Sequence, residues 1–283
     1  MPKTWDAKTV ITPDGVRVAV HSLGGRGSPI VLVHAAGLHG RVWTPMAAPL
    51  AEAFRCFAPD LRGHGDSAPP RSLDFDWRGF GADVGAVVDG LGLQQPFAMG
   101  HSSGATALLL AEEAKPGTFR AIYCFEPVVV AVDPPLGRDP DNWLAARARR
   151  RRADFASKTE AECHFATRPP LSSLSPAALH SYVEHGLERN EDGTVRLKCR
   201  PEHEALVYEM ATAHDCYSRL DQIRCPVTLA WGGCSEAFGP HLAKQLVARL
   251  PLARTEVLPG LGHLGPVEDP DVVADSVWRA FSG

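Results

Sequence analysis

The pentapeptide GHSSG at residues 100–104 is the stretch of this sequence with the clearest chemical potential. Its Gly-x-Ser-x-Gly pattern lies between an apolar segment with strand character, residues 96–101, and an apolar segment with helix character, residues 102–115. A sharp strand-to-helix turn lifts the central serine above the carboxyl edge of a sheet, and glycines are needed where a Cβ would clash. The helix N-terminus favours developing negative charge. We therefore predict Ser102 as a nucleophile and the backbone N–H of Ser103 as an oxyanion donor.

A second turn upstream has the character of an oxyanion site. VLVHAAG at residues 31–37 ends another apolar strand in a tight turn of small residues. A backbone N–H from this turn, that of Ala36, would complete a two-donor oxyanion hole, and one such donor contributes about 100- to 1,000-fold in rate.

A nucleophilic serine also needs a base, and the chain offers twelve histidines. His263 follows the last expected strand in the glycine-flanked loop LPGLGHLGP, residues 258–266, from which it could reach over the sheet edge. We predict His263 as the base that takes the proton of Ser102.

Strands and helices alternate on both sides of this serine. We expect a β-hairpin over 9–22, strands over 29–34, 54–60, 96–101, 119–127, 225–233 and 255–259, and helices over 43–53, 77–91, 102–115, 241–250 and 270–281. This alternation predicts an α/β fold, with a parallel sheet covered by helices on both faces.

The alternation stops after Pro127. Residues 133–219 show no convincing strand, and they contain proline breaks and helix-like pieces. We therefore predict one α/β core, residues 1–132 and 220–283, interrupted by a helical lid over 133–219.

With these features in hand, the chain resembles the α/β-hydrolase superfamily. The resemblance covers nearly the whole chain outside the insertion, and it rests on GHSSG, the VLVHAAG turn, DLRGHGDS at 60–67 and the late His263. It implies an α/β-hydrolase fold with a mostly parallel eight-stranded sheet and a helical lid. It also implies a catalytic triad in the chain order serine, acid, histidine.

The acid of this triad has two candidates. Most of the superfamily places an aspartate just after the seventh strand, where this chain has Ser235, followed by Glu236. If the chain is still extended there, neighbouring side chains point to opposite sides, so Glu236 points away from the side that the usual aspartate would face. Glu126 ends the preceding strand, in the apolar run AIYCFEPVVVAV at 121–132, and a lone buried carboxylate needs a partner. Some branches, including lactone hydrolases of the zearalenone type, place the acid there, so we predict Glu126, with Glu236 as the alternative.

The resemblance implies acyl transfer to water, that is, hydrolysis of an ester, lactone or thioester. A serine at the elbow argues against epoxide hydrolysis and haloalkane dehalogenation, because those relatives use aspartate. C–C bond hydrolysis of a diketone-like ring-cleavage product and a ligand receptor with the hydrolase fold remain as alternatives. We expect a mainly apolar small-molecule ester or lactone as substrate, with five candidate lining residues: Trp143, Phe155, Tyr182, Phe238 and Leu264.

The composition and charge of the chain argue against several other functional classes. The net charge of -4 argues against nucleic-acid or anionic-membrane binding, and we interpret the basic run ARARRRR at 146–152 as a solvated helix face on the lid. HEALVYE at 203–209 is not a zinc motif, and we expect neither metal nor cofactor. The seven scattered cysteines and a start without an apolar leader predict a cytoplasmic protein with reduced thiols. A homodimer is left open.

Overall fold

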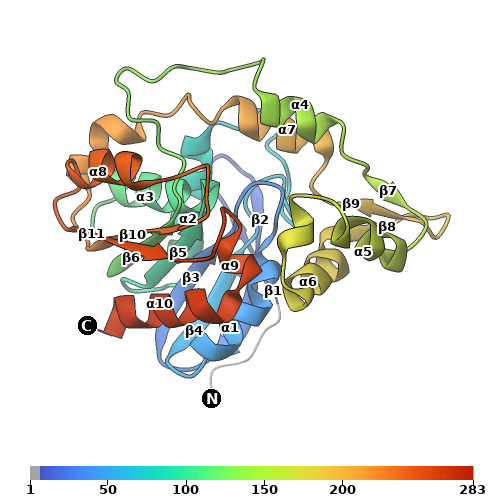
Figure 1. Ribbon diagram of the computed structural model, residues 1–283, viewed down its shortest axis with the longest axis horizontal. Helices are drawn as coiled ribbons and strands as arrows, with labels where there is room; N and C mark the ends of the chain where they lie inside the picture. The colour runs from blue at the N-terminus through green and yellow to red at the C-terminus, as the bar shows by residue number, and fades with distance from the viewer. Residues whose placement is uncertain (1–6, 283) are drawn as a thin grey trace.

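The computed structural model describes residues 7–282, so residues 1–6 and 283 of the predicted core lie outside the described residues. A central sheet has the strand order β1-β2-β4-β3-β5-β6-β10-β11 (Figure 1). Its strands are β1 (Ala7–Ile11), β2 (Arg17–Gly25), β3 (Ser28–Val33), β4 (Phe54–Pro59), β5 (Phe97–His101), β6 (Ala121–Phe125), β10 (Val227–Gly232) and β11 (Ala253–Leu258). The β1–β2 and β2–β4 pairs are antiparallel, and all other neighbours are parallel. The predicted fold class, an α/β-hydrolase fold with a mostly parallel eight-stranded sheet, is confirmed.

Helices cover both faces of this sheet. One apolar core packs against one face of the sheet, and a second packs against the opposite face. The first face carries α2 (Trp77–Gly90), α3 (Ser103–Ala114) and α8 (Pro240–Val247); the second carries α1 (Thr44–Leu50), preceded by η1 (Gly40–Trp43), and α9 (Gly265–Glu268) with α10 (Pro270–Ser282). Strands enclosed in this way are apolar throughout, as β10 is: all six of its residues are buried.

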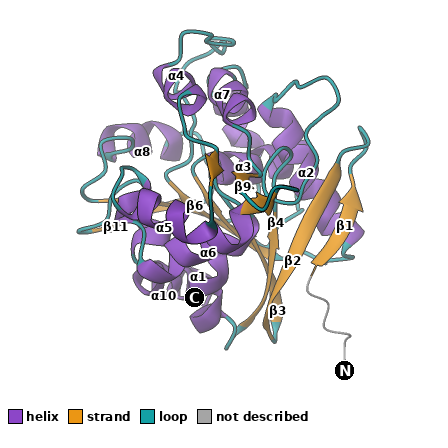
Figure 2. Ribbon diagram, turned by 90° about the vertical axis from the view of Figure 1, so that its right-hand side faces the viewer, coloured by secondary structure: helices purple, strands orange, loops and turns teal. Residues whose placement is uncertain are grey.

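The segment between β6 and β10 contains the insertion, residues 133–219. Its elements are α4 (Trp143–Arg149), β7 (Asp154–Phe155), α5 (Lys158–Ala166), η2 (Leu171–Ser173), α6 (Pro176–Gly186), β8 (Leu187–Arg189), β9 (Val195–Leu197), α7 (Pro201–Glu209) and the start of η3 (Cys216–Gln222). In Figure 2, α4 and α7 lie side by side above the sheet. The insertion is mainly helical, and the expectation that it contains no strand is wrong, because β7, β9 and β8 form a small antiparallel sheet. These strands have two or three residues each, too few to show a period of two.

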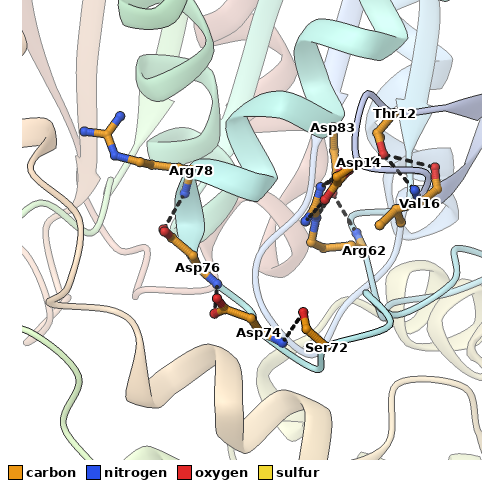
Figure 3. A network of polar contacts seen from close by, with 9 residues as sticks. All are labelled: Thr12, Asp14, Val16, Arg62, Ser72, Asp74, Asp76, Arg78 and Asp83. Atoms are coloured by element: carbon orange, nitrogen blue, oxygen red, sulfur yellow. Dashed lines mark hydrogen bonds and ion pairs between the residues drawn. The ribbon is translucent and has the colours of Figure 1, made fainter.

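The loop after β4 is fixed to its surroundings by buried charges. The Arg62 guanidinium bonds to Asp83 of α2 at 2.7 Å and to Asp14 of the first hairpin at 2.9 Å (Figure 3). Two residues earlier, Asp60 accepts from the backbone N–H of Gly40 at 2.6 Å and pairs with His21 at 2.9 Å. These bonds hold the loop after β4 against α2, the first hairpin and Gly40, the first residue of η1. Between residues 7 and 282, the helices are all too short or too polar to span a lipid bilayer.

Candidate active site

The elbow at Ser102 joins β5 to α3 with a strained backbone. Ser102 has φ 54° and ψ −120°, a left-handed conformation that a non-glycine residue rarely adopts. A Cβ on Gly100 would lie 2.6 Å from backbone atoms of α3, and one on Gly104 would lie 2.3 Å from a backbone oxygen at the end of β3. The Ser102 N–H donates to the carbonyl of Phe125 at 2.9 Å, and Ser103 begins α3, so its N–H has no partner within the helix. The glycines of GHSSG therefore allow the turn that places Ser102 at the sheet edge, where it is largely buried.

Glu126 is the buried carboxylate at this edge. It follows β6 directly, has φ 48° and is 1% exposed. Its Oε1 accepts from the backbone N–H of Gly232 at 2.9 Å, while Oε2 accepts from the Ser235 hydroxyl at 2.8 Å and from His263 Nδ1 at 2.6 Å. Three donors, one at the end of β10 and two from the loops after β10 and β11, thus converge on one carboxylate, which satisfies a group that could not be buried alone.

His263 is oriented from both its ring and its backbone. Because Glu126 accepts at Nδ1, a neutral His263 carries its proton there and presents Nε2 as a base. The His263 carbonyl lies 2.8 Å from Nε2 of His101, the residue before Ser102. Burial, together with the neighbouring His263, holds the pKa of His101 well below its ordinary value, so its ring is neutral and donates from Nε2. The Gly262 N–H donates to Glu268 at 2.7 Å, which fixes the loop on its other side.

The alternative acid does not reach this histidine. Glu236 is exposed, and the residue before it, Ser235, turns inward to donate to Glu126. The position that carries an aspartate in most of the superfamily is therefore occupied by a hydrogen-bond donor to the carboxylate on the neighbouring strand.

The turn after β3 lies against the elbow, as expected for an oxyanion donor. Ala36 is half-buried, and Gly37 has φ 76°. The turn is held by His34, whose Nδ1 lies 2.8 Å from the Ala35 carbonyl and whose Nε2 accepts from the Leu61 N–H at 2.9 Å. Burial lowers the pKa of His34 to about 3, which keeps Nε2 unprotonated as this bond requires.

The five predicted lining residues lie in different surroundings. Trp143 is 67% exposed at the start of α4, so it does not line an enclosed space. Phe155 and Tyr182 are buried in the insertion, and both rings contact Phe165. Phe238 packs beside the indole of β10, and Leu264, half-buried, packs on the second core. Tyr182 is bonded to a charged residue that the sequence did not single out.

That residue is Arg151, which lies with Glu204 over the turn after β3. It bonds to Glu204 of α7 and, at 2.7 Å, to the hydroxyl of Tyr182. The solvated-face interpretation of the run 146–152 is correct for the other four arginines, which are exposed, and wrong for Arg151, whose side chain is 20% exposed. A Cβ on Gly37 would lie 2.5 Å from Glu204 Oε1 and 3.2 Å from Arg151 Nη1. The sequence held no signal for this contact, because the two charges come from separate segments of the insertion, Arg151 from the loop after α4 and Glu204 from α7.

Comparison with known proteins agrees with this geometry. The sequence pattern that defines the alpha/beta hydrolase family matches residues 30–276. The chain belongs to this family. It is 26% identical over 279 residues to the putative carbamate hydrolase RutD of Caulobacter sp. (strain K31), covering 96% of this chain and 97% of the relative. It is also 26% identical to the soluble epoxide hydrolase of Corynebacterium sp. (strain C12), covering 91% of each chain.

Solved structures of this family superpose on nearly the whole chain. E-2-(acetamidomethylene)succinate hydrolase aligns with a TM-score of 0.82 and 21% identity, covering 98% of this chain and 99% of that one. At this identity the likeness speaks for the fold alone. Because the relatives in the alpha/beta hydrolase family are themselves hydrolases of varied bonds, this chain is a hydrolase, and its bond specificity must be argued from the site.

Proposed function

We propose that this protein is a serine hydrolase that cleaves carboxylic esters or lactones through an acyl-enzyme on Ser102, with His263 as base and Glu126 as acid. The observation that carries the proposal is the 2.6 Å bond between Glu126 Oε2 and His263 Nδ1 at the edge where Ser102 emerges. A serine at the elbow with a carboxylate-oriented histidine is the arrangement that acyl transfer requires.

The proposed reaction begins when His263 Nε2 takes the Ser102 proton and the serine Oγ attacks the substrate carbonyl. The resulting oxyanion is stabilised by the backbone N–H groups of Ala36 and Ser103. Collapse breaks the bond to the leaving alcohol, which receives the proton from His263. Water then attacks the acyl-enzyme with the same base and releases the carboxylic acid, and Glu126 stabilises the imidazolium in both halves.

This mechanism distinguishes the protein from its epoxide-hydrolysing relative. The resemblance noted above implies an aspartate nucleophile for that class, and the elbow here carries Ser102. The three donors on Glu126, one of them the Ser235 hydroxyl, also support a carboxylate that stays an acceptor throughout the cycle.

A substrate panel tests the proposal. Wild type and Ser102→Ala are compared on p-nitrophenyl esters, on lactones and on a vinylogous diketone, with Ser172→Ala, an exposed serine of the insertion, as the matched control. We expect turnover of esters or lactones, its loss in Ser102→Ala alone, and an acyl adduct on Ser102 by mass spectrometry. Equal activity of wild type and Ser102→Ala would refute the serine mechanism, and turnover of the diketone alone would replace ester hydrolysis by C–C cleavage.

A further inference from the structure

A largely buried ion pair lies over Gly37 in the turn after β3, the turn proposed to supply an oxyanion donor. Arg151 and Glu204 contact each other over Gly37, whose lack of a Cβ leaves room for the Glu204 carboxylate. The side chain of Glu204 is 6% exposed. Burying such a pair costs desolvation that its mutual attraction only roughly repays, so it is weak evidence for a purely stabilising role. Its position next to Ala36 suggests a role toward the substrate.

The hydrogen-bonding groups of this cluster are mainly donors. One Arg151 N–H is given to Glu204 and one to the Tyr182 oxygen, out of the five that a guanidinium carries. Burial raises the pKa of Tyr182, so at neutral pH the phenol keeps its proton and can donate it while its oxygen accepts from Arg151. The ring of Tyr182 is itself fixed by stacking on His39, with ring centroids 5.8 Å apart. A rigid O–H donor is therefore held on the far side of Arg151 from Gly37.

The net charge of the cluster determines which kind of substrate oxygen can receive this hydrogen bond. Arg151 and Glu204 together are neutral, so a substrate carboxylate would add an uncompensated negative charge in a largely enclosed place. Burying that charge carries a desolvation cost, whereas a neutral carbonyl or ether oxygen adds no charge to be desolvated. A neutral acceptor would also satisfy the Tyr182 proton, and leaving a buried donor unpaired has a cost of its own.

We propose that Tyr182, held by Arg151, is a specificity-determining residue that donates a hydrogen bond to a second, neutral oxygen of the substrate acyl chain. The preferred substrates are then oxo- or alkoxy-substituted esters or lactones rather than plain alkyl esters or half-esters of dicarboxylic acids. This inference rests on the proposed hydrolase function, because it places the second oxygen relative to the carbonyl that Ser102 attacks.

Matched esters test the donor. The kcat/KM of wild type is measured on p-nitrophenyl hexanoate, on oxohexanoates with the ketone moved along the chain, and on the p-nitrophenyl half-ester of glutarate. We expect one oxo ester to exceed the hexanoate by about tenfold, the effect of one hydrogen bond. This ratio falls toward one in Tyr182→Phe and is kept in Tyr217→Phe, a tyrosine outside the site, packed against the first core with Arg249 over its ring. A wild-type ratio below two, or a ratio unaffected by Tyr182→Phe, overturns the proposal.

A charge variant separates the neutral acceptor from a carboxylate. In Glu204→Gln the charge of Arg151 is uncompensated, so we expect the glutarate half-ester to gain at least tenfold relative to the oxo ester. If wild type already prefers the half-ester, the subsite binds an anion and the neutral-acceptor proposal is wrong.

A binding measurement keeps this test independent of turnover. Hexanamide and the oxohexanamides are titrated into Ser102→Ala by calorimetry, with and without Tyr182→Phe. Tighter binding of an oxo amide that depends on Tyr182 supports the subsite even if no ester is hydrolysed, in which case only the proposed function fails. Equal binding of all the amides overturns the subsite.

Discussion

Replacing Glu126 with glutamine removes one charge from the site and keeps the shape of the side chain. The structure shows why this change should be severe. The carboxylate accepts three hydrogen bonds, one at Oε1 from Gly232 and two at Oε2 from Ser235 and His263. A glutamine has only one acceptor oxygen, so its NH2 group must face a donor on one side.

The fixed backbone N–H of Gly232 determines which donor the glutamine NH2 group must face. The N–H of Gly232 cannot rotate away, and an unpaired buried donor costs about 1–3 kcal/mol. The amide oxygen of glutamine is therefore expected to face Gly232, which leaves its NH2 group toward His263. The imidazole must then accept at Nδ1 and carry its proton at Nε2, the tautomer that cannot take a proton from Ser102.

The expected loss in kcat is about 1,000- to 10,000-fold, or about 4–5.5 kcal/mol at 1.36 kcal/mol per decade. The corresponding acid-to-amide change in a well-studied protease triad costs about 10,000-fold for the same reason. The assay is steady-state hydrolysis of the best p-nitrophenyl ester, with folding checked by thermal melting. Glu236→Gln is the matched control and should stay within about twofold of wild type, since this exposed side chain makes none of the three bonds above. Near-full activity in Glu126→Gln with a large loss in Glu236→Gln would refute the assignment.

Three further outcomes follow from the same geometry. Ser235→Ala removes one donor from the Glu126 carboxylate and should lower kcat about tenfold with KM unchanged, as a hydrogen bond to a charged group contributes about 1.5–3 kcal/mol; a change confined to KM would contradict this. Gly37→Ala should lower both activity and the melting temperature by more than Gly193→Ala does, since both have positive φ but only the first Cβ meets Glu204, at 2.5 Å; equal effects would show that the turn yields freely. Because burial lowers the pKa of His34 to about 3, against about 6.5 when unfolded, the unfolded chain binds the proton first as the pH falls. The stability from this group is complete above about pH 6.5 and falls by about 2 kcal/mol by pH 5, so a free energy of unfolding that is unchanged between those values would show that His34 is not buried neutral.

The sequence by itself determined the order of the core strands and helices and the positions of two site residues. Apolar strands, glycine-bounded turns and the chain order of Ser102 and His263 are local signals, and the rules of parallel sheets bring their carboxyl ends to one edge. Glu126 could also be selected from the sequence, because a single carboxylate in an apolar strand needs a partner. The short strands β7, β8 and β9 escaped prediction because two or three residues carry no period.

Only the tertiary structure decided which side chains from distant segments meet. Ser235, predicted to be merely the residue that replaces the usual aspartate, donates to Glu126, which lies 109 positions earlier in the chain. In the sequence, Arg151 is one arginine in a run of similar ones. In the structure, the packing of α4 against α7 places it, with Glu204, over Gly37. The sequence of a charged run does not show which of its members face solvent. Whether one of them faces a buried carboxylate instead depends on how the segments of the insertion pack. That packing, rather than any motif, determines which charged groups lie over Gly37 in the turn after β3.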